Sequence, residues 1–277
     1  MSSYIVCLFV SLCCSLIIAS TAGGAIHKNS KNAKRSTDHI SCLAPVDGPR
    51  LGFQNEHGKN MKDQLVAAGE RVELKCEVFG TPQATIHWKH NGILMEKSAP
   101  IGNYESRMEN GDEPIIGLST TVAVLVIDCV DDETAGHYSC VADNGCTEAI
   151  ESSAIVAIEQ NGEKHPACPV RSIFAGITPR INLWTDSLLE RPEVAATLFC
   201  RAEGRPKPKI EWMVEDDNEI YQKVSNGDKH VLLPNGDLLI RGHGTAENSK
   251  AGVGYKCVAS NNYGSASLKS IIIRAHA

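Results

Sequence analysis

The chain has 277 residues, enough for two domains of about 100 residues with a remainder. With 42% hydrophobic and 22% charged residues, its composition is ordinary for a globular protein. The net charge of -6 is mild and gives no reason to expect nucleic acid as a partner.

Residues 1–22 are typical of a secretory signal peptide. The apolar run from Ile5 to Ile18 is shorter than the about 20 residues that a membrane span needs, and small residues up to Ala22 follow it. An apolar core helix is disfavoured because polar sequence comes next. No later run reaches spanning length. We therefore expect cleavage after Ala22, no membrane span, and a secreted, extracellular product.

Residues 23–48 are polar and basic, so we expect a disordered arm. From residue 49 short runs alternate with turn residues, and no window keeps a period of 3.6. Several strands at this spacing predict an all-β sandwich or barrel for residues 49–159. Asn144-Gly145 is a signal for a two-residue hairpin.

Residues 160–177 contain Gly and two Pro and are read as a linker between two domains. The second domain, residues 178–277, contains the β-type runs RINLW, ATLFCRAE, KIEWMVE, KHVLLPNGDLLI, YKCVASNN and ASLKSIIIR.

Both domains carry the same cysteine and tryptophan spacing. Trp88 lies twelve residues after Cys76, and Trp212 lies twelve residues after Cys200. Each has a later cysteine, Cys140 or Cys257, with Tyr138 or Tyr255 two positions before it. Three matched landmarks, offset by a whole domain length, indicate a duplicated domain.

The cysteine frames have a physical meaning in a β-sandwich. A bond from Cys76 to Cys140, or from Cys200 to Cys257, would cross the interior and join the two sheets. Trp88 and Trp212 would pack in the core against these bridges. The hydroxyls of Tyr138 and Tyr255 would bond to nearby backbone in a tyrosine corner.

At this point the sequence resembles a known family. LVIDCVDDETAGHYSC (125–140) is similar to the immunoglobulin signature, and GRPKPKIEW with LPNGDLLI and CVASNNYGSAS resembles intermediate-type (I-set) immunoglobulin domains. A signal peptide followed by two such domains resembles the nematode zwei-Ig secreted proteins. It also resembles an ecdysone-inducible insect two-immunoglobulin protein that binds insulin. The matching stretches cover most of residues 178–265, and the first domain matches mainly in frame.

The resemblance implies a secreted, non-enzymatic binding protein without cofactors. It would sequester an extracellular protein or peptide such as an insulin-like hormone, or maintain axon architecture through a neuronal surface protein. The alternative is a homophilic adhesion or matrix module. No catalytic motif of the G-x-S-x-G, His-Glu-x-x-His or Walker type occurs, and no cysteine spacing suits a structural zinc.

Eight of the eleven cysteines lie beyond the signal peptide, which suits four disulfides. The four outside the frames allow three pairings. Cys146 and Cys42 are expected at one end of the first sandwich, and Cys129 and Cys168 at the other. We therefore expect the pairs Cys42–Cys146 and Cys129–Cys168.

The run TTVAVLVID is apolar on both faces of its strand. If Leu125 and Ile127 point inward, then Val122, Val124 and Val126 point outward and need cover. A partner protein, the other domain or a second copy could supply it, and β-branched residues also simply suit strands. We take these three valines as a candidate partner surface.

Arg205, Lys207 and Lys209 form a small basic cluster on a loop. A weak glycosaminoglycan contact is one interpretation. Ordinary solvated loop positions are the other.

Overall fold

The computed structural model describes residues 48–54, 61–95, 116–159, 168, 175–242 and 252–275. All of them fall in one compact unit, Arg35–Ala277. Every element in these ranges is a β-strand, which confirms the all-β class. The expected signal peptide lies outside the described residues, as do nearly all of the arm and most of the linker.

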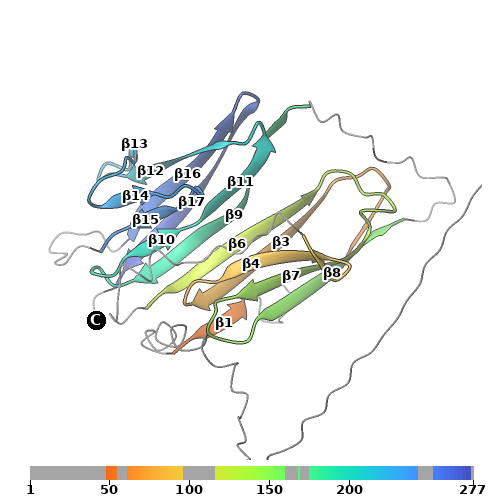
Figure 1. Ribbon diagram of the computed structural model, residues 1–277, viewed down its shortest axis with the longest axis horizontal. Helices are drawn as coiled ribbons and strands as arrows, with labels where there is room; N and C mark the ends of the chain where they lie inside the picture. The colour runs from red at the N-terminus through yellow and green to blue at the C-terminus, as the bar shows by residue number, and fades with distance from the viewer. Residues whose placement is uncertain are drawn as a thin grey trace, which may run out of the picture. The chain divides into compact units, whose positions relative to one another are not determined.

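Strands β1 to β8 form the first of two sandwiches (Figure 1). One of its sheets contains β1 (Arg50–Phe53), β3 (Val72–Thr81) and β6 (Leu118–Ile127). The other has the order β2 (Gln64–Val66), β8 (Ile150–Ile158), β7 (Gly136–Asp143), β4 (Thr85–His90) and β5 (Ile93–Leu94). Alternate residues of β3 enter the core, as a period of two requires: Val72, Leu74, Cys76 and Val78.

Strands β9 to β17 form the second sandwich. Its larger sheet contains β9 (Ile177–Glu190), β11 (Cys200–Arg205), β17 (Gly264–Arg274), β16 (Gly252–Asn261), β12 (Lys209–Glu215) and β13 (Tyr221–Lys223). The smaller one contains β10 (Ala196–Leu198), β15 (Leu238–Ile240) and β14 (His230–Leu232). The buried core of the second sandwich includes Leu198, Trp212, Leu238, Ile240 and Tyr255.

The two sandwiches share a sheet because Leu118–Ala123 of β6 pair antiparallel with Leu183–Leu189 of β9. Figure 1 shows these two long strands side by side. The resulting nine-stranded sheet has the order β1-β3-β6-β9-β17-β16-β12-β13, with β11 also on β9. Long open edges tend to pair with other chains. Here the paired parts of β6 and β9 cover each other. The strands at the ends of the described sheets have two to four residues, and β11, which pairs only with β9, has six.

The two-residue hairpin expected at Asn144-Gly145 is wrong. Strand β8 begins only at Ile150, so a longer loop follows β7. The buried Asn144 side chain shapes this loop: its Nδ2 donates to Arg50 O (3.0 Å), and its Oδ1 accepts from Cys146 N (3.0 Å) and Thr147 N (2.9 Å). Cys146 therefore lies in the loop before β8.

Candidate binding site at the sandwich junction

Strand β9 changes partners at Thr185. Before this residue β9 pairs with β11, and after it β9 pairs in parallel with β17, while β6 lies along its other side. The fully buried Thr185 Oγ1 accepts hydrogen bonds from Phe199 N (2.8 Å) and from Gln83 Nε2 (2.6 Å). Gln83 belongs to the turn between β3 and β4. Thr185 thus links the strand switch to the first sandwich.

Glu190, at the end of β9, is a second polar link. Its buried carboxylate accepts hydrogen bonds from Ile116 N (2.8 Å) and Gly117 N (2.9 Å), just before β6, and from Arg191 N (2.9 Å). Burial raises the pKa of this carboxyl, whereas the backbone donors and the nearby Arg274 act to lower it. The carboxylate therefore holds the start of β6 against the second sandwich.

The raised pKa of Glu190 predicts a pH-dependent stability. A group whose pKa is higher in the folded state stabilises most below its unfolded value and loses that contribution as pH rises through its folded value. We expect the advantage of the wild type over Glu190→Gln to be largest near pH 4 and to shrink as pH rises, since glutamine does not titrate. Urea unfolding of both proteins at a series of pH values from about 4 upward measures this difference in unfolding free energy. A difference that grows with pH would contradict the expectation.

Apolar side chains also join the two sandwiches. Leu183 and Phe199, from the second sandwich, belong to the same buried cluster as Cys76, Val78 and Ala123 of the first. Leu183 lies opposite Ala123 in the β6–β9 ladder. The core of the first sandwich is therefore completed by residues of the second.

The candidate partner surface needs a correction at Val122. This side chain is only 1% exposed and lies opposite Trp184 of β9, so it is not available to a partner. Val124 and Val126 are half-buried. The second sandwich covers Val122 because hydrogen bonding of β6 to β9 brings both faces of β6 against apolar side chains.

Replacing Val122 with lysine is expected to weaken the junction. The change removes a fully buried apolar side chain and places a charge between Glu77 and Trp184. We expect a loss of at least about 2 kcal/mol in unfolding free energy. Val124→Lys is the matched control, because Val124 lies on the same strand face but is half-buried. Urea unfolding compares the two, and equal midpoints would contradict the assignment.

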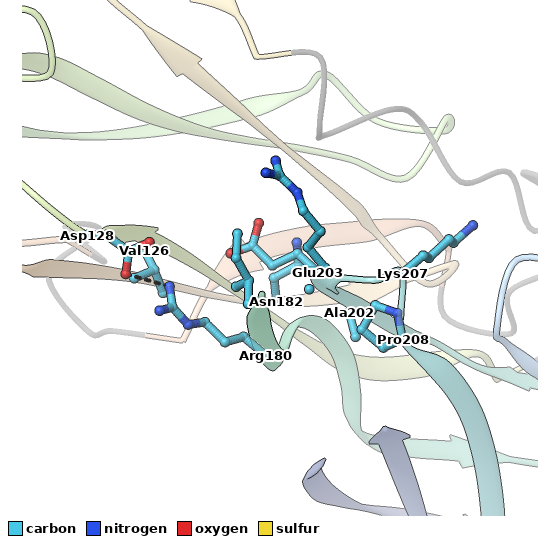
Figure 2. Close-up of a pocket in the computed structure, with 11 residues that line it drawn as sticks. Val126, Asp128, Arg180, Asn182, Ala202, Glu203, Lys207 and Pro208 are labelled. Atoms are coloured by element: carbon cyan, nitrogen blue, oxygen red, sulfur yellow. Dashed lines mark ion pairs between the residues drawn. The ribbon is translucent and has the colours of Figure 1, made fainter. Parts of the chain in front are cut away.

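A groove of ≈ 420 Å³ opens where β6 ends beside the second sandwich (Figure 2). Its apolar lining includes Val126, Ile177 and Pro208. On one side Arg180 bridges to Asp128 at 2.7 Å, an ion pair between the sandwiches. A groove of this size suits a side chain or short loop of a bound molecule.

The groove brings together two features that the sequence marked separately. Val126 comes from the valine run, and Arg205 and Lys207 come from the basic cluster. Lys209 instead pairs with Glu211 Oε1 at 2.8 Å on β12. Asn182 also lines the groove, and its buried Oδ1 accepts no hydrogen bond within the described part of the chain. The groove therefore brings apolar side chains together with cationic and acidic ones.

The structure places the cysteines as follows. Disulfides join Cys76 to Cys140 and Cys200 to Cys257, with Cα–Cα distances of 6.4 and 6.5 Å. A third joins Cys129 to Cys168 at 5.9 Å, beside the groove residue Asp128. Cys146 is disulfide-bonded, whereas its expected partner Cys42 lies outside the described residues.

The aromatic residues of the two frames are buried, but their tyrosines have different partners. Trp88 and Trp212 lie in the cores, and Trp212 Nε1 donates to Gly236 O at 2.9 Å. Tyr138 donates to the backbone oxygen of Thr134 at 2.5 Å, which is a tyrosine corner. Tyr255 instead lies 3.0 Å from His230 Nε2. Burial raises the pKa of both tyrosines to about 12, so both hydroxyls keep their protons at neutral pH.

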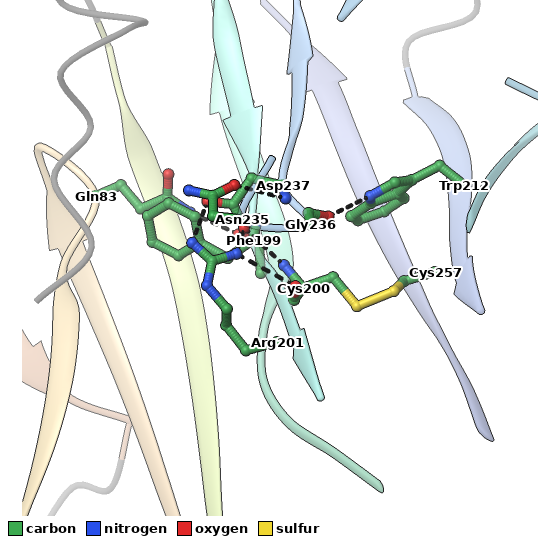
Figure 3. Close-up of polar contacts among 10 residues, drawn as sticks. Gln83, Phe199, Cys200, Arg201, Trp212, Asn235, Gly236, Asp237 and Cys257 are labelled. Carbon is green, nitrogen blue, oxygen red and sulfur yellow. Dashed lines mark hydrogen bonds and ion pairs between the residues drawn. A yellow bond between two sulfur atoms is a disulfide. The ribbon is translucent and has the colours of Figure 1, made fainter. Parts of the chain in front are cut away.

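Sequence reasoning did not single out the polar residues of the junction. Gln83, Thr185 and Glu190 stand in ordinary turns and strands, and so does the buried Asp237 inside the second sandwich. Asp237 was visible only as part of the LPNGDLLI motif. Its carboxylate accepts hydrogen bonds from Cys200 N (3.0 Å) and from the Arg201 guanidinium (Figure 3). A carboxylate directly before a buried strand is the one signal that could have marked it.

Two further findings concern only the described ranges. None of their residues form a helix that is both long and apolar enough to cross a bilayer. Within the same ranges, no group of three or more His, Cys, Asp and Glu side chains is arranged to bind a metal ion.

Known families match both sandwiches. An immunoglobulin domain model matches residues 58–144, and the immunoglobulin I-set domain model matches residues 187–272. The crystal structure of neural ectodermal development factor IMP-L2 superposes with a TM-score of 0.60 over 82% of this chain and 95% of that chain. Its 23% identity makes this a likeness of fold. The chain is therefore a tandem of immunoglobulin β-sandwiches.

Two nematode relatives are more similar in sequence. Zwei Ig domain protein zig-4 of Caenorhabditis elegans is 36% identical over 206 residues, which cover 74% of this chain and 74% of that protein. Zwei Ig domain protein zig-3 of the same species is 32% identical over 206 residues, covering 74% and 75%. These matches confirm the resemblance read from the sequence, and the chain belongs to the zwei Ig domain protein family.

Proposed function

We propose that this protein is a secreted binding protein that sequesters an extracellular protein ligand, such as an insulin-like peptide, and thereby supports nervous-system architecture. Its immunoglobulin domains and its family support a binding or adhesion function. The finer proposal draws on the resemblance of the sequence to an insulin-binding two-immunoglobulin protein.

The shared sheet is the observation that carries the proposal. Pairing of β6 with β9, with the links at Thr185 and Glu190, holds two domains in one fixed arrangement. A binder whose surfaces are already placed loses less entropy on association than one with a flexible hinge. The groove formed by Val126, Arg180 and Lys207 is one surface that both sandwiches build.

A direct binding assay tests the proposal. Purified full-length protein is immobilised and titrated with a panel of insulin-like peptides. Peptides of equal charge that are unrelated to insulin serve as controls. We expect saturable binding of at least one insulin-like peptide and weaker binding by Val122→Lys, in which the junction is loosened. Absence of saturable binding across the panel would overturn the sequestration proposal.

Homophilic adhesion is the alternative. Strand addition between copies would need a long free edge, and the described edge strands are short, with two to four residues at the sheet ends and six in β11. We therefore expect the protein to sediment as a monomer at micromolar concentration. Concentration-dependent dimers that persist in Val122→Lys would favour adhesion instead.

A further inference from the structure

The outer face of the shared sheet carries an aligned set of three apolar side chains and one glycine near Glu190. Strand register places Leu118 of β6 opposite Leu189 of β9, Leu189 beside Ile273 of β17, and Ile273 opposite Gly252 of β16. We call these four residues the apolar row. It crosses four strands and takes residues from both sandwiches, so it exists only while β6 and β9 are paired.

The apolar row is accessible to a partner. Leu118 is 40% exposed and Ile273 is 41% exposed, while Leu189 is half-buried. Ile271, one step along β17, is 48% exposed and lies opposite Gly254. An exposed apolar patch assembled across a domain junction is a mark of an interaction site.

Lysines border the apolar row on one side. Lys269 and Lys256 lie opposite each other, two residues from Ile271 and Gly254 on the same strand faces. Both ammonium groups lie over the Tyr221 ring, at 3.9 Å for Lys256 and 5.5 Å for Lys269. The Tyr221 hydroxyl reaches Glu215 Oε2 at 3.5 Å. Tyr221 thus contacts two ammonium groups and one carboxylate, which leaves positive charge beside the row.

A second pair of lysines on this face also shares a single carboxylate. Lys209 and Lys223 both contact Glu211 Oε1, at 2.8 and 2.6 Å. These contacts lower the pKa of Glu211 to about 2, so it stays ionised at any physiological pH. Strands β12, β13, β16 and β17 therefore present four lysines and two glutamates on a chain whose net charge is -6.

The spacing of the row suits a helix. Neighbouring strands lie about 4.8 Å apart, so three strand intervals extend about 14 Å. One helical turn rises about 5.4 Å, so apolar side chains one turn apart would meet successive members of the row. An extended segment could not join the ladder here, because β6, β9, β17 and β16 are all interior strands.

We propose that the apolar row and its bordering lysines, Lys256 and Lys269, form a docking surface for an amphipathic, acidic helix of an extracellular protein. Apolar side chains of the helix cover Leu118, Leu189 and Ile273, and carboxylates on its flank face the two lysines. This assignment rests on the proposed function, since it names the kind of partner that the binding protein would take.

Two synthetic helical peptides test the surface directly. Both are about 14 residues long, which exceeds the length of the row at 1.5 Å per residue. They share a leucine stripe and differ only in carrying glutamate or lysine elsewhere. By fluorescence anisotropy, we expect full-length protein to bind the glutamate peptide about tenfold more tightly, since two exposed charge pairs replace two repulsions.

Variants locate the binding on the molecule. Leu118→Thr and Ile273→Thr are each expected to weaken binding of the glutamate peptide roughly fivefold, by loss of apolar contact. Ile93→Thr is the matched control, because Ile93 is 74% exposed on β5 of the other sheet. The double variant Lys256→Glu with Lys269→Glu should reverse the preference between the peptides. The proposed docking surface is wrong if Ile273→Thr binds the glutamate peptide as tightly as the wild type does, or if Ile93→Thr weakens binding as much as Leu118→Thr and Ile273→Thr do.

The two proposals fail in different ways. If an insulin-like peptide binds the wild type, Leu118→Thr and Ile273→Thr equally well, sequestration stands and the docking surface falls. If no insulin-like peptide binds, while the glutamate peptide binds and the threonine variants weaken it, the surface stands and the sequestration proposal falls.

Discussion

Replacing Asp237 with alanine is expected to destabilise the second sandwich by about 3–5 kcal/mol, the usual effect of breaking a buried charge pair from one side. Asp237 is buried at the start of β15 and accepts hydrogen bonds from Cys200 N at 3.0 Å and from Arg201 Nη2 at 2.5 Å. Alanine leaves a partly buried guanidinium and a buried backbone N–H without this acceptor, next to the Cys200–Cys257 bridge (Figure 3).

Urea unfolding followed by tryptophan fluorescence measures this loss, because Trp212 lies in the same core. Asp228→Ala is the control: Asp228 is exposed in the same sandwich, and such substitutions usually stay within about 0.5 kcal/mol. A midpoint for Asp237→Ala equal to that of the control would show that Arg201 finds water or another acceptor at no cost.

Cys200→Ala is expected to leave the second sandwich largely unfolded. The bond to Cys257 closes a loop with a sequence separation of 57 residues, and both cysteines are buried beside Trp212. Chain entropy alone gives about 4 kcal/mol for a loop of this length. That is close to the lower end of the net stability of a whole domain. We therefore expect a strong fall in yield from a secretory expression host and loss of the cooperative melting transition.

The double variant Cys200→Ala with Cys257→Ala separates loss of the bond from the effect of a free thiol. If the missing bond is the cause, the double variant should be as unstable as the single one. Normal yield with an unchanged melting temperature in either variant would contradict the role given to this bridge.

Opening of the second sandwich also bears on the first. Phe199 and Leu183 enter the core of the first sandwich, and Thr185 receives Gln83. Cys200 directly follows Phe199 in the chain. Loss of the Cys200–Cys257 bridge should therefore also lower the unfolding free energy of the first sandwich, which hydrogen exchange of its backbone amides would detect. We therefore expect the two domains to unfold together.

The sequence by itself determined the β-sandwich class and the two disulfides that join the sheets, Cys76–Cys140 and Cys200–Cys257. Cys76, Trp88, Tyr138 and Cys140 recur at the same spacing in the second half, and a period of two decides which side of a strand faces a core. Such signals are local: they depend on the residue types within one strand and on short intervals to the next. The same locality explains the error at Asn144, where a turn dipeptide acts through a buried side chain that bonds to Arg50.

Only the tertiary structure decided what covers the valine run and how the two sandwiches meet. The sequence showed that β6 is apolar on both faces, but a strand edge pairs through backbone groups that are the same for every residue. Its partner β9 was therefore not marked by any side-chain pattern. The links at Thr185 and Glu190 join residues 102 and 73 positions from their partners Gln83 and Gly117. Contacts at that separation follow from packing, because no periodic pattern in either segment encodes the other.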